Sequence, residues 1–362
     1  MIKRTLTFLF VLYCSVTAVV AQFAMPFEDG RKYFYVFTNG APQQLETMAV
    51  QQYKVAENNV VYINNANELR TYYNGEKSKA GEGLSAVLGS SGGLIWYTRD
   101  NSLSVFEKGQ PVSLSFFVGD YKAGDHIIAF KDSRIDLLKV YFQGQIYELE
   151  YTLVSKLGDY QAGDNVVAFI NGSHYFKVFS QGETMELSTW EPKEFLCGKD
   201  MVSFVDGGSG ELKLFVTDKI VKLENFTPVS MQMGDDVFAY VSDENAFKVY
   251  SKGKLLKIES YAPDTYTVKD NIVSYFADNK FQVFYNGERY NLETVPPRQI
   301  VISNNCMAYL DGAGRLKLFN NGKTQLVTTE TTQGFELNGD VLKFYDSGNM
   351  QRIFYNGKIY GN

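Results

Sequence analysis

The sequence predicts an all-β fold made of one repeated unit, and three features support this prediction. Aromatic residues make up 15% of the 362 residues, Gly is frequent and Pro is scarce. Short stretches alternate between apolar and polar residues, as expected for β-strands. Tight turns separate these stretches at a nearly constant spacing. Strand-forming residues joined by tight turns are typical of antiparallel sheets.

The turns define the repeat. Successive turns lie 34 to 38 residues apart, which indicates ten copies of one structural unit. Most turns read Asn-Gly, Lys-Gly or Gln-Gly, and Asn and Gly best tolerate the positive φ that a two-residue hairpin turn requires. Asp218 takes the place of Gly in one unit. The turn glycines are Gly40, Gly75, Gly109, Gly144, Gly182, Gly253, Gly287, Gly322 and Gly357.

Each turn follows a strand with a fixed pattern. An aromatic residue stands three positions before the turn glycine in every unit, and an aliphatic residue or Thr precedes it, as in Val36-Phe37 and Leu318-Phe319. The position before that is mostly Lys or Arg. Because both faces of this strand carry apolar residues, we expect it to be buried between neighbouring sheets. The basic column favours Lys and Arg stems covering the aromatic residues with their charged ends in water; a basic binding band is the alternative.

Further strands complete the unit. One strand precedes the aromatic strand and ends on its own aromatic residue, such as Phe130 or Tyr309. Another follows the turn and carries an aliphatic residue such as Leu45 or Leu187. A weaker fourth segment often closes on Gly-Asp or Lys-Asp. The unit is therefore predicted to be an antiparallel meander of three or four strands.

Ten such meanders must stack on one another, because one small meander cannot bury both of its faces. Radial stacking gives a β-propeller, which also protects strand edges. A single ten-bladed ring is favoured because the period is unbroken. Two five-bladed rings and an open β-solenoid remain alternatives. Neither end of the repeat array supplies a spare strand, so closure is expected to depend on packing between the first and last units, or the ring stays open.

The N-terminus predicts export. Lys3 and Arg4 precede an apolar run from Thr5 to Val20, and small residues end at Ala21, so 1–21 is predicted to be a Sec signal peptide and 22–362 the repeat domain. Tyr13 before Cys14 argues against a lipoprotein. Cleavage leaves 33 basic against 41 acidic residues, which argues against a nucleic-acid partner. No later segment is long enough to span a membrane.

Catalytic and cofactor chemistry is not predicted. The two histidines, His126 and His174, have no repeated partner at ligand spacing, and no phosphate-binding glycine loop precedes a helix. Acidic residues at the strand entries offer one or two ligands per loop, too few for calcium. Asp235-Asp236 and Asp243-Glu244 are expected at opposite ends of one strand, too far apart for a glycosidase pair. Cys197 and Cys306 lie in separate units and are predicted to be free, buried thiols.

Candidate binding residues are aromatic residues that break the repeat. Trp190 lies in a segment where other units have no Trp. Tyr121 and Tyr160 occupy two copies of a Gly-Asp-Tyr-x-Ala-Gly-Asp segment, and Tyr261 lies in the matching region of a later unit. We expect all four to lie on exposed loops, where aromatic residues anchor protein partners or stack on sugars.

The hairpin array behind a signal peptide resembles short-blade propellers and propeller-like repeat proteins of the Gram-negative periplasm. The resemblance implies a fold and a type of role, such as a soluble accessory or plug subunit of an outer-membrane translocon like that of type 9 secretion. The leading hypothesis is a non-enzymatic periplasmic or secreted scaffold that binds a protein partner. The alternative is a glycan-binding, lectin-like propeller.

Overall fold

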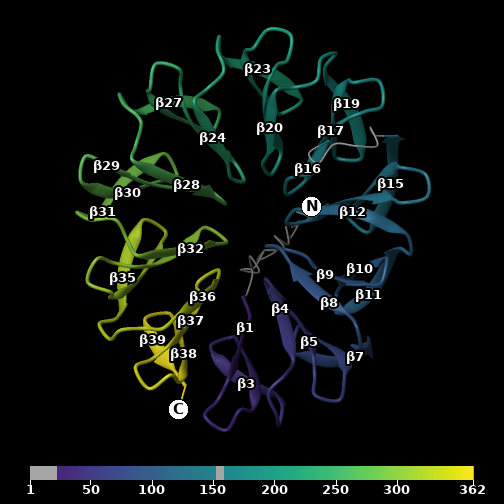
Figure 1. The fold of residues 1–362 in the computed structure, drawn as a ribbon. Coiled ribbons are helices and arrows are strands. Elements are labelled where there is room, and N and C mark those ends of the chain that lie inside the picture. Colours follow the sequence, from purple (N-terminus) through teal and green to yellow (C-terminus); the bar gives the residue numbers. More distant parts are fainter. Residues whose placement is uncertain (1–22, 152–158, 362) are drawn as a thin grey trace, which may run out of the picture.

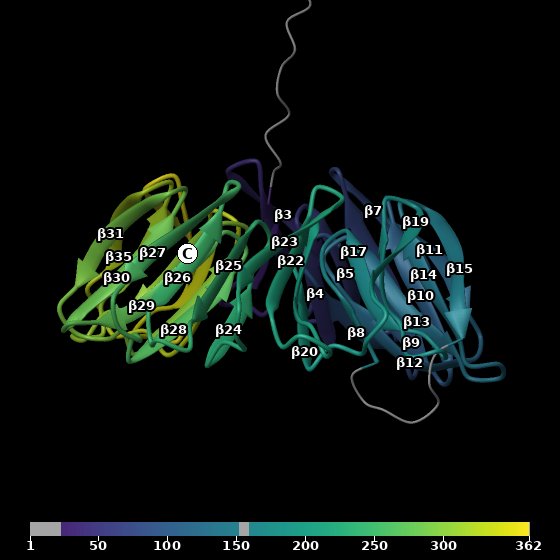
Figure 2. The ribbon, with the colours of Figure 1, turned by 90° about the horizontal axis from the view of Figure 1, so that it is seen from above.

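The computed structural model describes residues 23–151 and 159–361. These residues form 39 strands in ten antiparallel sheets. The sheets stand side by side around a central axis and form one closed ring, seen face-on in Figure 1 and edge-on in Figure 2. Among the described residues, no helix has the length and apolar character needed to cross a membrane. The predicted signal peptide and Cys14 lie outside the described residues.

Each sheet is one blade, and the blades are numbered 1 to 10 in chain order. Within a blade, successive strands of the chain follow one another from the axis to the rim. The inner strands are β4 (Gln52–Ala56), β8 (Val87–Ser90), β12 (Val118–Ala123), β16 (Tyr160–Ala162), β20 (Glu194–Cys197), β24 (Ser230–Met233), β28 (Thr265–Lys269), β32 (Gln299–Ser303) and β36 (Phe335–Asn338). The second strands are β1 (Met25–Glu28), β5 (Asn59–Ile63), β9 (Ile95–Arg99), β13 (Ile127–Asp132), β17 (Val166–Ile170), β21 (Met201–Val205), β25 (Val237–Val241), β29 (Ile272–Ala277), β33 (Cys306–Leu310) and β37 (Val341–Tyr345).

The third strands are the predicted aromatic strands: β2 (Phe34–Thr38), β6 (Glu68–Tyr73), β10 (Ser102–Glu107), β14 (Leu137–Phe142), β18 (Phe176–Ser180), β22 (Leu212–Val216), β26 (Phe247–Ser251), β30 (Lys280–Tyr285), β34 (Leu316–Asn320) and β38 (Gln351–Tyr355). The outer strands are β3 (Ala41–Glu46), β7 (Glu76–Glu82), β11 (Gln110–Ser115), β15 (Gln145–Tyr151), β19 (Glu183–Ser188), β23 (Lys219–Glu224), β27 (Lys254–Glu259), β31 (Glu288–Glu293), β35 (Lys323–Thr328) and β39 (Lys358–Tyr360).

The third strands form the core, as the alternation predicts. All ten aromatic residues of this column are buried, and so are the ten residues that precede them. Their side chains pack between adjacent blades; Phe179 of blade 5, for example, contacts Phe142 of blade 4 edge-on. The turns that follow have positive φ at both central residues, including Thr217-Asp218, which lacks glycine. The ten-unit propeller and its hairpin turns are therefore confirmed.

A β-bulge explains the aliphatic residue of the outer strand. In blade 1, Phe34 pairs with Glu46 and Tyr35 with Gln44, so Leu45 is the extra residue. Leu45 is 3% exposed, and the equivalent Leu187 and Ile258 are also buried. The bulge thus points an aliphatic side chain of the outer strand into the core, although the rest of this strand is largely exposed.

Within residues 23–361, as far as the structure describes them, no sheet combines strands from both ends of the chain. Blade 1 has three described strands, while the other nine blades have four. Phe37 of blade 1 contacts Tyr355 and Tyr360 of blade 10, with ring centroids 5.6 and 4.9 Å apart. Met25 and Ile353 are buried in the same cluster. Side-chain packing between first and last blades therefore closes the ring, which excludes the open solenoid and the two five-bladed rings.

Polar contacts protect the free inner edge of β1. Pro26 has no N–H, and the N–H of Glu28 donates to Gln351 Oε1 at 2.9 Å. The Nδ2 of Asn338, at the end of β36, donates to the carbonyl oxygens of Ala24 and Glu57 at 2.8 Å each. Asn338 thus ties blades 10, 1 and 2 together beside β1, the innermost described strand of blade 1.

Both cysteines of the described residues are free, as predicted. Cys306 lies on β33 of blade 9 and is buried. Cys197 ends β20 of blade 6 and is partly buried, so the prediction of two buried thiols is confirmed for Cys306 alone. Burial raises the pKa of each thiol to about 12, which leaves both protonated and unreactive at neutral pH.

Candidate functional site

The antiparallel order of each blade sorts the loops onto two faces of the disc. One face carries the turns between first and second strands and those between third and outer strands. We call it the inner-turn face. The other carries the turns between second and third strands and the loops that connect the outer strand of one blade with the inner strand of the next. We call it the crossing-loop face. Figure 2 shows the disc from the side, so that its two faces lie above and below.

The crossing-loop face exposes large apolar side chains. Of the crossing loops that the structure describes, seven between blades 1 and 9 carry at least one such residue. The exposed fractions are 60% for Met48, 68% for Leu84, 70% for Phe116, 63% for Trp190, 62% for Phe226, 47% for Tyr261 and 47% for Val295. These side chains sit in the same structural position of successive blades and so form an arc on one face.

Two of the four predicted binding residues belong to this arc. Trp190 lies in the crossing loop 189–193, and its ring stands against Gly208 in the next blade, where even a Cβ would come within 2.9 Å of the indole. The N–H of Trp190 donates to Ser188 Oγ at 3.1 Å. Tyr261 lies in the crossing loop 260–264. The expectation that both lie on exposed loops is confirmed.

The expectation was wrong for Tyr121 and Tyr160. Tyr160 lies on the inner strand β16, is 2% exposed, and donates its hydroxyl to Asp120 Oδ2 at 2.9 Å. Tyr121 lies on β12, is partly buried, and packs edge-on against Trp96. The flanking Gly-Asp pairs resemble loop residues in the sequence, but each second pair is an inner turn that follows an inner strand.

The crossing loops are held in place by backbone hydrogen bonds. The N–H of the last loop residue donates to the carbonyl of the second strand in five blades: Gln51 to Ile63, Lys193 to Val205, Val229 to Val241, Asp264 to Phe276 and Arg298 to Leu310. Each bond measures 2.9 Å and extends the pairing of the inner strand. The exposed side chains therefore stand on ordered backbone.

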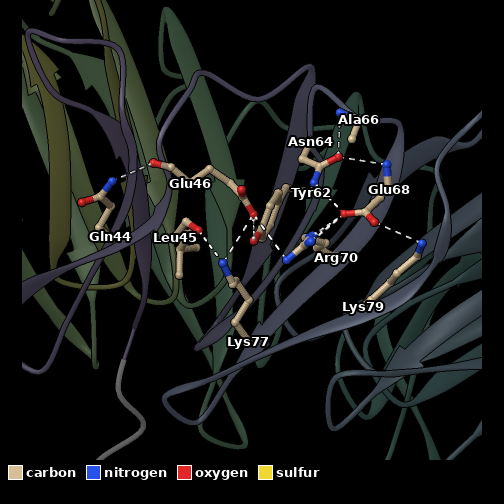
Figure 3. A network of polar contacts seen from close by, with 10 residues as sticks. All are labelled: Gln44, Leu45, Glu46, Tyr62, Asn64, Ala66, Glu68, Arg70, Lys77 and Lys79. Carbon is tan, nitrogen blue, oxygen red and sulfur yellow. Dashed lines mark hydrogen bonds and ion pairs between the residues drawn. The ribbon is translucent and has the colours of Figure 1, made fainter.

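Partly buried ion pairs lie at the junctions between blades. In Figure 3, Glu46 of blade 1 accepts a hydrogen bond from the Tyr62 hydroxyl at 2.9 Å and lies 3.8 Å from Arg70 Nη1 and 3.6 Å from Lys77 Nζ. Burial and the neighbouring Glu46 raise the pKa of Tyr62, so its hydroxyl stays protonated and donates. The same triad recurs as Tyr240–Glu224–Lys248 and Tyr309–Glu293–Lys317.

These triads revise the interpretation of the basic column. The charged ends of Arg70, Lys248 and Lys317 do not reach water as expected; they pair with the glutamate that follows the bulge of the preceding blade. The basic residues could be recognised from the repeat pattern, but their glutamate partners could not, because each of these glutamates lies in the preceding repeat. Part of the column therefore joins blades, whereas Lys139, Lys213 and Arg352 pair with acidic residues of their own blade.

The inner turns form a hydrogen-bonded collar around the axis. Asp164 N–H donates to the Gly198 carbonyl at 3.0 Å, Lys199 N–H to Asp235 at 2.8 Å and Asp235 N–H to Asp270 at 2.6 Å. Across blades 3 and 4, the N–H of Gly92 donates to Asp125 Oδ1 at 2.7 Å. Neighbouring inner turns thus support one another along this arc of the collar.

Carboxylates crowd the centre of the collar. Oxygen atoms of Asp125, Asp235 and Asp270, from blades 4, 7 and 8, lie within 4.8 Å of one another, so these three could together hold a cation. Burial, followed by the charges of Asp270 and Asp125, raises the pKa of Asp235 to about 7. This cluster could not be predicted from one loop of the sequence, because its three aspartates come from three blades that only the closed ring brings together.

The histidines have carboxylate partners. His126 Nδ1 contacts Asp164 Oδ1, and its Nε2 lies 4.0 Å from Glu57 Oε1. The contact with Asp164 raises the pKa of His126. His174 pairs with Glu191 on the opposite face. Asp235 and Asp236 lie in an inner turn, and Asp243 and Glu244 lie beyond β25 at the other end of the blade, as predicted.

A family model decides the assignment of the fold. The model of the 10-bladed beta propeller domain matches residues 18–360, nearly the whole chain. The protein belongs to this family. Blade count, strand order and closure of this ten-bladed propeller all agree with the match. No match appears among curated proteins.

Solved structures with a similar chain trace include three proteins. The computationally designed Ika8 protein is 16% identical, covers 75% of this chain and 96% of its own, and has a TM-score of 0.39. The CRINKLY WD40 ectodomain of the Arabidopsis thaliana receptor kinase ACR4 is 9% identical, with coverage of 64% and 90% and a TM-score of 0.34. Streptogramin B lyase is 16% identical, with coverage of 67% and 96% and a TM-score of 0.31.

Proposed function

We propose that this ten-bladed propeller is an exported, non-enzymatic scaffold that binds a protein partner through its crossing-loop face. The arc of exposed apolar residues on that face is the observation that carries the proposal. Scattered apolar residues are common on protein surfaces, but a set repeated in the same position of successive blades is not explained by packing. Large aromatic side chains such as Trp190 and Phe226 are typical anchors of interfaces.

Ordered backbone under the arc supports the same proposal. Binding is weakened by the entropy lost when mobile loops become fixed. The crossing loops of blades 6 to 9 are already tied to the second strand of their blade by 2.9 Å hydrogen bonds. A partner with a complementary apolar surface would therefore lose little loop entropy on docking, and the fold supplies a rigid platform.

A non-enzymatic role is supported by the polar groups of the described residues. The two acidic pairs of blade 7, Asp235-Asp236 and Asp243-Glu244, lie on opposite faces, because β25 separates them. The Tyr–Glu–Lys triads are engaged in joining blades. Export is supported by the basic start and apolar run of residues 1–21. A periplasmic accessory subunit of an outer-membrane secretion complex is the role that we propose.

Affinity capture from detergent-solubilised envelopes tests the proposal. The tagged protein is compared with the variant Trp190→Ala/Tyr261→Ala and with a control variant, Ile220→Ala/Leu255→Ala, which truncates exposed apolar residues on the outer strands β23 and β27. We expect a stoichiometric protein partner with the wild type and the control, and loss of most of it with the crossing-loop variant. Retention by the crossing-loop variant, or loss with the control, would contradict the proposal.

A further inference from the structure

The inner-turn face has a trough across blades 5 to 9, with a cavity volume of about 640 Å³. It lies between the inner turns and the turns of the third and outer strands. These blades are coloured from teal to yellow-green in Figure 1. Nothing in the crossing-loop interface accounts for this cavity, which opens on the opposite side of the disc.

One column of the repeat explains why the trough is there. The last residue of the third strand is large in several blades, and its ring covers the core aromatic residue of the next blade edge-on. Phe142 covers Phe179, Tyr285 covers Phe319 and Tyr355 covers Phe37. In blades 5, 6 and 7 this position is small: Ser180, Val216 and Ser251. Three consecutive blades thus lack an aromatic cover, and the space remains open.

The walls of the trough carry hydrogen-bonding side chains at one per blade. The inner wall consists of the last residues of four successive inner turns, Asp200, Asp236, Asn271 and Asn305. Hydrogen bonds fix the two amides, because Asn271 Oδ1 accepts from Asp236 N–H at 2.9 Å and Asn305 Oδ1 from Asn271 N–H at 3.0 Å. The outer wall repeats the pattern with Gln181, Thr217, Lys252 and Asn286.

Two tyrosine rings border the same space, and Tyr285 is partly exposed there whereas Tyr250 is mostly buried. Tyr250 and Tyr285 line the trough, and Tyr285 is held by its edge-on contact with Phe319 at 6.0 Å. Groups that donate and accept hydrogen bonds along two walls, with rings between them, suit a chain that carries hydroxyl groups on both edges and C–H groups on its faces. Asp200, Asp218 and Asp236 line the trough against one lysine, Lys252, and this acidic balance disfavours phosphate-bearing or acidic chains. A peptide chain would need an open strand edge or apolar pockets.

We propose that this trough binds a neutral oligosaccharide that lies across blades 5 to 9. The site is one extended groove, in contrast to the one shallow site per blade that a repeated lectin would show. It does not depend on the protein partner proposed for the opposite face.

Rebuilding the missing aromatic cover tests the proposal. The probes are neutral hexasaccharides of glucose, xylose, mannose and N-acetylglucosamine, first on an array and then by calorimetry. We expect the wild type to bind at least one of them, and Ser251→Tyr, which places in blade 7 the residue that blades 2, 8 and 10 have there, to weaken binding by roughly tenfold or more. Thr38→Tyr makes the same change in blade 1, outside the trough, and should bind as the wild type does.

Further variants keep the test decisive. If Ser251→Tyr unfolds, Tyr285→Ser removes the ring from the trough and is expected to weaken the same sugar. Trp190→Ala should leave sugar binding unchanged, which separates this site from the crossing-loop interface. A blank array, equal affinity in the wild type and in the trough variants, or loss of binding with Thr38→Tyr would overturn the proposal.

Discussion

The two faces of the disc are built from the same ten units and differ in what their side chains contact. On the inner-turn face, backbone and side chains bond to the neighbouring turn, from Gly92 and Asp125 to Asn338 at the seam. On the crossing-loop face, backbone bonds also join some blades, as from Val118 N–H to the Asn101 carbonyl at 2.8 Å, but large side chains such as Phe116 and Trp190 remain more than 60% exposed. Both faces therefore help to join blades, and the difference that favours the crossing-loop face as a partner surface is its exposed large apolar side chains.

The largest effect is expected at the seam of the collar. Asn338→Ala removes the donor to the carbonyls of Ala24 and Glu57. Because Asn338 is 5% exposed, these acceptors lose a partner where water has little access, so we expect a loss of about 2 to 3 kcal/mol in the free energy of unfolding. Urea denaturation measures it. A loss below about 0.5 kcal/mol would show that the collar does not hold the seam.

A smaller effect is expected at a blade junction beneath the crossing loops. Glu293→Ala leaves the buried Tyr309 hydroxyl without this acceptor, while Lys317 keeps its pair with Asp311 at 3.1 Å, so we expect a cost of about 1 to 2 kcal/mol. Adding Tyr309→Phe should recover part of the loss, because the unpaired hydroxyl is then gone. Glu288→Ala, which removes an exposed glutamate from the same strand, is the control. Equal stability of the two single variants would refute the role of the triad.

Charge crowding at the axis predicts a gain in stability. The folded pKa of Asp235 is about 7, above its ordinary value of 3.8, so the folded state takes up its proton at the higher pH. The penalty is full above pH 7 and fades as the pH falls toward 4. Asp235→Asn should therefore stabilise the protein by about 1 to 2 kcal/mol at pH 8, after allowance for solvent screening, and by less at pH 5.

Thermal unfolding at both pH values, with a chelator present to remove divalent cations, measures this gain. Asp243→Asn lies at the other end of the same blade and serves as the control. A gain that is equal at pH 5 and pH 8 would contradict the raised pKa of Asp235.

The smallest stability effect is expected on the crossing-loop face. Trp190 is 63% exposed, so Trp190→Ala should change the free energy of unfolding by no more than about 0.5 kcal/mol. The same urea titration as for Asn338→Ala gives the direct contrast between the faces. A loss of 2 kcal/mol or more would mean that Trp190 serves the packing of blades 5 and 6 and not a partner.

The repeat could be predicted because its signals are local. Turn glycines, aromatic columns and the period all lie within 40 residues, and each has a direct physical cause in strand pairing or turn geometry. The count of ten blades followed from the period. Closure by side-chain packing was one of two expectations, and the contacts of Phe37 with Tyr355 and Tyr360 decided between them.

The sites were harder to predict because they combine distant units. Asp125 and Asp235 are 110 positions apart and meet only across the axis of the ring. Tyr160 looked like a loop residue because glycine and aspartate flank its strand on both sides. The apolar arc was found in part, through Trp190 and Tyr261, since its members Met48, Leu84 and Val295 share a position and no residue type.

Site-specific photo-crosslinking tests the central claim most directly. A photoreactive phenylalanine analogue is placed at Trp190 on the crossing-loop face or at Lys252 on the inner-turn face, and the two proteins are irradiated in intact envelopes. We predict a discrete protein adduct from position 190 and none from position 252. An adduct from position 252 alone would contradict the assignment of the crossing-loop face as the protein interface.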